Sequence, residues 1–103
     1  MSPRATYKKI IVTDELVAKI NPVNVKLSEW FLKEKSTRAS DTTVRAYRSD
    51  SNIFFVWNLL HNDNKVFTDI KKLDLSDFFY YTTEELRWGS SRNNRMRSFL
   101  SSL

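Results

Sequence analysis

The residue types that could support catalysis are few, and they do not combine into an active site. The chain has one histidine, His61, and no cysteine, so a histidine-based metal site or a catalytic triad lacks its parts. His61 lies at the predicted end of a helix, which favours a capping or surface role. The acids Asp74 and Asp77 are better explained as helix-start residues, and Glu84 and Glu85 as a solvated face. We therefore expect no enzymatic activity, no cofactor and no metal.

Aromatic side chains offer two other kinds of chemistry, base stacking and nucleophilic attack. The tryptophans and most of the phenylalanines recur at core spacing on predicted helices, so packing is favoured over stacking on unpaired bases. Tyr47 is predicted to be core, while Tyr80 and Tyr81 lack surrounding arginine and histidine chemistry. The aromatic residues predicted to pack are Trp30, Trp57, Trp88, Phe54, Phe55, Phe78 and Phe79.

Basic residues carry the stronger signal. The net charge is +5, the first twelve residues contain no acid, and no acid follows Glu85. This distribution points to a polyanionic partner. Two clusters suit phosphate contact: hydroxyls at a predicted helix start, where free N–H groups attract anions, and small polar groups between arginines on the last helix. The hydroxyls at the helix start could instead be plain helix caps, and the polar face of the last helix could simply be solvated. The clusters are Ser40, Thr42 and Thr43, and Asn94, Arg95, Arg97, Ser98 and Ser101.

The positioning elements are predicted to be helices in one domain, because a single glycine and two prolines leave little turn chemistry for a β protein. Residues 1–12 are predicted to form a flexible basic arm, and residues 13–103 the helical domain. Thr13 is the expected N-cap of a short first helix. Gly89 is expected to end a helix at positive φ. Longer helices are predicted over 22–35, 40–60, 74–88 (starting at Asp74 or Ser76) and 90–103, with an irregular segment over 66–73.

Apolar spacing assigns a buried face to each predicted helix. The second of the longer helices is apolar nearly all round toward its end, which predicts a central position in a bundle. The last helix has no stop signal, so we expect the chain to be part of a longer protein. The predicted stripes are Val23, Leu27, Trp30 and Phe31; Val44, Tyr47, Ser51, Phe54 and Phe55; Leu75, Phe78, Phe79 and Leu86; and Met96, Phe99, Leu100 and Leu103.

Three segments in order resemble the core-binding domains of tyrosine recombinases of the phage-integrase type. The first runs from Ser40 to Asp50, where Thr43, Tyr47 and Asp50 fill a T-x-x-x-Y-x-x-D-like pattern ahead of an aromatic-rich run. The second is the "ld..dF..y"-like segment 73–81, and the third is the Ser/Asn/Arg-led helix 91–100. The match spans residues 22–103.

The resemblance implies a four-helix, SAM-like core-binding bundle that forms half of a clamp around duplex DNA at the crossover site. A catalytic domain of the same parent chain, with the nucleophilic tyrosine, would supply the other half, and other recombinase protomers would complete the synaptic complex. The implied setting is cytoplasmic and nucleoid-associated, in a bacterium or encoded by a phage. The implied DNA contacts are Arg38, Thr42, Thr43, Arg45, Arg48, Ser49, Ser91, Arg92, Asn94, Arg95 and Arg97.

Two other functions fit the same residues. A helix-turn-helix-like regulator would dimerise and favour a palindrome, whereas the core-binding domain is expected to be a monomer in isolation. A helical protein-interaction module would carry basic faces that are merely solvated and would show no salt-sensitive DNA binding. No apolar run approaches the ~20 residues of a membrane span, so no membrane partner is expected.

Overall fold

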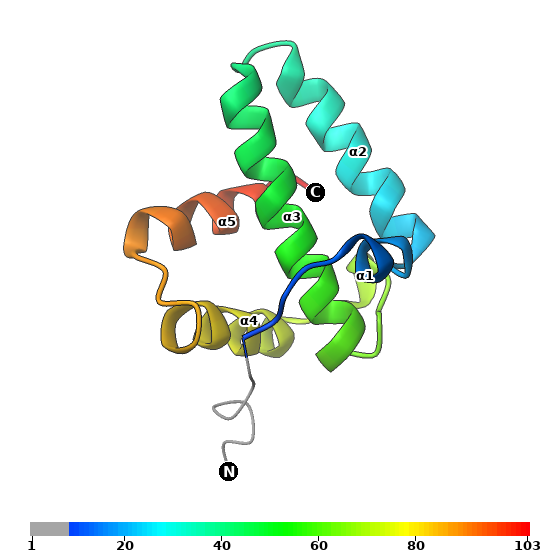
Figure 1. Cartoon of the computed structure of the whole chain (residues 1–103), viewed down its shortest axis with the longest axis vertical. Helices are drawn as coiled ribbons and strands as arrows, with labels where there is room; N and C mark the ends of the chain where they lie inside the picture. The colour runs from blue at the N-terminus through cyan, green and yellow to red at the C-terminus, as the bar shows by residue number, and fades with distance from the viewer. Residues whose placement is uncertain (1–8) are drawn as a thin grey trace.

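The structure is a computed structural model that describes residues 9–103, and all regular secondary structure in that range is helical. The predicted all-α class is thereby confirmed, and the predicted arm residues before Lys9 lie outside the described residues. Figure 1 shows α3 running through the middle of the molecule, with the other helices around it. The helices are α1 (Asp14–Ala18), α2 (Pro22–Ser36), α3 (Asp41–His61), α4 (Lys72–Glu84) and α5 (Ser90–Ser102), with a 3-10 turn, η2 (Phe67–Asp69).

Local capping sets the starts of the first three helices where the sequence predicts them. The Thr13 side chain caps α1 by accepting a hydrogen bond from the Leu16 N–H. Pro22 occupies the first turn of α2, and the Ser40 hydroxyl accepts from the Thr43 N–H at 3.2 Å at the start of α3. These side chains satisfy backbone donors that a helix leaves without partners.

Aromatic rings hold the helices together around α3, as predicted from its apolar circumference. Phe54 and Trp57 of α3 are fully buried and pack on Phe78 of α4, with the Phe54 and Phe78 ring centroids 4.8 Å apart. Phe31 of α2 meets Phe99 of α5 edge-on at 4.9 Å. Edge-to-face pairs of this kind add stabilisation beyond the area that they bury. Of the predicted core residues of the last helix, Met96, Phe99 and Leu100 are buried, and Leu103 is partly buried against the core.

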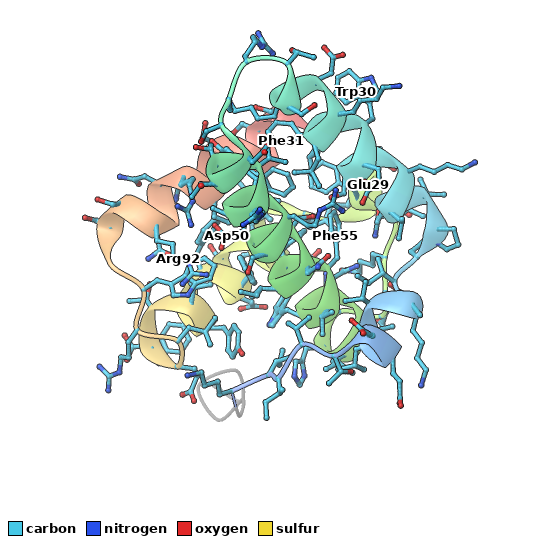
Figure 2. All side chains as sticks on the ribbon, turned by 45° about the horizontal axis from the view of Figure 1, so that its top comes forward. Glu29, Trp30, Phe31, Asp50, Phe55 and Arg92 are labelled. Atoms are coloured by element: carbon cyan, nitrogen blue, oxygen red, sulfur yellow. The ribbon has the colours of Figure 1, made fainter. Side chains whose placement is uncertain are left out.

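The buried face of α2 differs from the predicted stripe. Val23 is 52% exposed and Trp30 57% exposed, and Figure 2 shows Trp30 on the outer side of the helix. Asn24 and Ser28 are buried instead: the Asn24 amide donates to the Lys65 carbonyl at 2.8 Å, and the Ser28 and Ser51 hydroxyls bond at 2.6 Å. Hydrophobic periodicity could not identify this face, because internal hydrogen bonds satisfy its polar groups.

The ends of α4 also differ from the prediction. The helix begins at Lys72 rather than at Asp74 or Ser76, because the Asp74 carboxylate reaches back and accepts a hydrogen bond from the Lys71 N–H at 2.8 Å, which is one of the two bonds of a capping box. It ends at Glu84, well before Trp88. The left-handed residue beyond it is Arg87, with φ 59°, whereas Gly89 has φ −77° and is the N-cap of α5. The predicted positive φ at Gly89 is therefore wrong.

Residues 9–12 run along the helical body. The Ile10 N–H donates to the Tyr81 hydroxyl at 2.7 Å, and Ile10 and Val12 pack against the core. Tyr81 itself has no exposed surface, and burial, together with the charge of Glu85, raises the pKa of its hydroxyl despite the hydrogen bond from Ile10. Among the described residues, no helix is long and apolar enough to cross a membrane.

Candidate nucleic-acid interface

The best-defined polar cluster joins α3 to α5 around Asp50. This carboxylate is 1% exposed, and each of its oxygens accepts hydrogen bonds from one arginine of α5. Arg92 donates from Nε and Nη2 to Oδ1 at 3.3 and 2.8 Å, and Arg95 donates from Nε and Nη2 to Oδ2 at 3.0 and 2.7 Å. Figure 2 shows Asp50 on α3 with Arg92 beside it on α5. Two positive charges therefore share one negative charge.

This geometry orients both guanidinium groups. The bonds to Asp50 use Nε and Nη2. Within residues 9–103 the Nη1 group of neither arginine donates a hydrogen bond, so Nη1 can donate to a ligand. The Arg92 guanidinium also lies over the Trp88 ring, 4.1 Å from its centre, in a cation–π contact. The two side chains remain 39% and 38% exposed. Water or an anion can thus reach both groups, although their positions are fixed.

The outer side of α3 presents further predicted contact residues. Thr42, Arg45 and Ser49 are exposed and follow one another at helical spacing. Ser49 lines a groove of about 330 Å³ together with Arg92, so the α3 residues adjoin the arginine pair. Lys9 and Asn52 add a cation and an amide to the same groove. On α5, Ser91 and Asn94 are exposed as well.

The remaining predicted contacts are divided among other environments. Thr43 lies in the cap of α3, where its hydroxyl is 3.0 Å from the Ser40 hydroxyl; this is the plain capping role that the sequence left open. Arg48 forms an exposed ion pair with Glu29 of α2, with a shortest distance of 2.6 Å. Such a surface pair contributes about 0.5 kcal/mol or less, but it reduces the positive charge beside α3.

Arg97 and Arg38 lie away from the Asp50 cluster. The Arg97 guanidinium is stacked at 4.1 Å on the Phe79 ring of α4, on a different side of α5 from Arg92 and Arg95. Arg38 lines a shallow hollow between α2 and the end of α5. The candidate interface is therefore narrower than the predicted set. We define the α3–α5 face as Thr42, Arg45, Ser49, Ser91, Arg92, Asn94 and Arg95.

Asp74, one of the acids considered for catalysis, has a structural role. Asp74 belongs to the start of α4, where Lys65 also contacts its carboxylate at 3.1 Å. Burial by itself would raise the pKa of this carboxyl, but the Lys71 N–H and the Lys65 ammonium outweigh that effect and hold the pKa below its ordinary value of 3.8. Residues 9–103 contain no cluster of His, Cys, Asp and Glu able to hold a metal ion.

The anchoring role of Asp50 was missed by sequence reasoning, which treated Arg92 and Arg95 as wholly outward. A signal was present: Asp50 is an acid on the same side of its helix as Tyr47 and Phe54, where the other residues are buried. Its partners lie 42 and 45 residues away, so only the tertiary fold identifies them. Comparisons of the chain with protein-family models, curated proteins and solved structures give no match.

Proposed function

We propose that this chain binds duplex DNA through the α3–α5 face. The observation that carries the proposal is the pair of arginines anchored to Asp50. Each guanidinium is held in a fixed orientation by two hydrogen bonds, and more than a third of each arginine side chain is exposed. A planar, fixed donor of this kind suits phosphate oxygens, and fixing it in advance reduces the entropy lost on binding.

The neighbouring side chains extend the same surface. Arg45 adds a cation with no ion-pair partner among the described residues, and Ser49 and Thr42 are small hydroxyls that allow a helix to approach a phosphate backbone closely. The whole chain carries a net charge of +5, which favours association with a polyanion at long range. The contacts in this proposal are mainly with phosphates, so we expect the chain to bind duplexes of different sequence with similar affinity.

We further propose that the domain is a SAM-like core-binding domain of a tyrosine recombinase, acting as half of a clamp at the crossover site. Support comes from the order and spacing of the three resembling segments, and from an all-helical fold in which side chains of α3 and α5 meet around Asp50. Reading the parent gene beyond the codon for Leu103 tests this part. Spaced arginines, a His-x-x-Arg segment and a late tyrosine in frame would support it, whereas an unrelated continuation would contradict it.

The DNA-binding proposal is tested by titrating a labelled duplex with the chain at several salt concentrations. If about five phosphates are neutralised, log K falls with log salt at a slope of about −4.5. Arg45→Ala should make the slope of log K against log salt less negative by about 0.9, because one phosphate contact is lost. Lys26→Ala, which removes one exposed charge from α2, is the matched control and should leave the slope nearly unchanged. Binding that is insensitive to salt, or equal effects of the two variants, would refute the proposed face.

The double variant Arg92→Lys and Arg95→Lys tests the anchored arginines. It keeps both charges, so the salt slope should stay the same, but it removes the planar donors. We expect the affinity for DNA to fall by about 3- to 10-fold at constant salt. Circular dichroism and urea unfolding identify any loss of fold. An unchanged affinity in a folded double variant would show that these two arginines have no special role.

A further inference from the structure

A second surface, on the other side of α5, remains outside the proposed DNA contact. A groove of about 480 Å³ lies between α4 and α5, and its apolar part is formed by Leu75, Phe79 and Leu100. Its polar part comes from two cations and two hydroxyls: Lys72, Arg97, Ser76 and Ser101. None of the residues that line it is acidic. Its chemistry is therefore apolar and positively charged.

The cations of this groove are available to a ligand. Neither Lys72 nor Arg97 forms an ion pair with an acid among residues 9–103, in contrast to Arg48, Lys65, Arg92 and Arg95. The Arg97 guanidinium is stacked at 4.1 Å on the Phe79 ring. A guanidinium in this position over a ring can still use its N–H groups to bind a carboxylate in bidentate fashion.

We propose that this α4–α5 groove binds an acidic amphipathic helix of a partner protein. Apolar side chains of the partner would pack on Leu75, Phe79 and Leu100, and its carboxylates would pair with Arg97 and Lys72. A groove between two helices is a common receptor for the apolar face of a third, and the charge of the rim selects acidic flanks. The apolar floor distinguishes this site from a phosphate-binding surface, where polar contacts dominate.

The probe for this test is a fluorescein-labelled synthetic peptide of about four helical turns, with leucines along one face and glutamates beside them. Binding to the full chain is measured by fluorescence polarisation. Arg97→Gln with Lys72→Gln should weaken binding by about 10-fold or more. The matched control, Lys26→Gln with Lys33→Gln, removes two exposed charges from α2 and should have little effect. A peptide with glutamine in place of glutamate should bind as weakly to the native chain as the glutamate peptide binds to the groove variant.

A blocking variant tests the apolar part separately. Ser76→Phe keeps every charge but fills the groove with a ring, so it should abolish peptide binding while DNA binding stays normal. The proposal is overturned if the peptide binds the groove variant and the native chain equally. It is also overturned if the groove variant loses DNA affinity far beyond its charge-matched control, because the groove would then be a DNA contact. Failure of DNA binding in the native chain does not affect this test.

Discussion

Burying the Asp50 carboxylate at 1% exposure requires partners, because an ionised carboxylate without them is strongly disfavoured away from water. Arg92 and Arg95 supply four hydrogen bonds from the neighbouring helix. The acid thereby joins α3 to α5 and fixes the two cations at the same time. One residue thus connects the stability of the fold with the electrostatics of the proposed interface.

Removing both arginines should destabilise the protein through the acid that they leave behind. In the double variant Arg92→Ala and Arg95→Ala, the buried Asp50 carboxyl loses all four of these hydrogen bonds. Unpairing a buried charge costs about 3–5 kcal/mol, and the lower end applies here because water reaches the arginine side of the pair. Urea unfolding measures the loss. Adding Asp50→Asn to the double variant should recover part of it.

Arg45→Ala is the control for this prediction. Arg45 lies on the exposed side of α3 and bonds to no buried acid, so its removal should change the free energy of unfolding by less than about 0.5 kcal/mol. If the double variant proves as stable as Arg45→Ala, the Asp50 bridge does not hold α3 to α5.

At the scale of helices, the start of α4 depends on a charge that can be titrated. Asp74 accepts from the Lys71 N–H and pairs with Lys65, and its pKa is held below 3.8. A carboxyl whose pKa is lower in the folded state stabilises the fold above the unfolded pKa, and this contribution is lost as the pH falls through the folded pKa. Asp74→Asn should therefore cost about 1 kcal/mol at neutral pH.

The pH dependence distinguishes this charge effect from a packing effect. Thermal melts should show the native chain and Asp74→Asn converging in stability as the pH falls below 3.8 and through the lower pKa of folded Asp74, where the native side chain loses its charge too. Glu84→Gln, at the exposed far end of the same helix, should show no such convergence. A gap between the native chain and Asp74→Asn that persists in acid would contradict the assigned role.

The sequence predicted the starts of α2, α3 and α5 but not that of α4, although the bond from the Lys71 N–H to Asp74 that sets it is equally local. Asn21-Pro22 and Ser40 mark the starts of α2 and α3 through chemistry within a few residues. The last helix, α5, starts at Ser90 as predicted, although its N-cap Gly89 has no side chain to cap it. The buried side of α2 was mispredicted because Asn24 and Ser28 find their partners in distant segments. Arg87 takes the left-handed conformation expected of Gly89, so the position of the cap depends on where α4 ends rather than on residue type.

Across the whole molecule, α5 separates two positively charged surfaces of different chemistry. One side carries the arginines that Asp50 anchors, beside exposed hydroxyls of α3. The other carries Arg97 on Phe79, at the edge of an apolar groove. The predicted DNA contacts had combined both sides, although Arg95 and Arg97, two residues apart on a predicted helix, lie about 200° apart around its axis. Under the proposals above, Arg92 and Arg95 contact DNA, whereas Arg97 contacts an acidic partner.

If these two surfaces act independently, one molecule should bind DNA and the acidic peptide together. Sites that share no side chain usually couple by less than about 0.5 kcal/mol, or roughly two-fold in affinity. The peptide is titrated into the chain with and without a saturating unlabelled duplex at constant salt. We expect the peptide affinity to change by less than about three-fold. The DNA and the acidic peptide would lie on different sides of α5, where salt screens the repulsion between them. Full displacement of the peptide by the duplex would mean that both ligands occupy a single surface, and the division of α5 into two sides would be wrong.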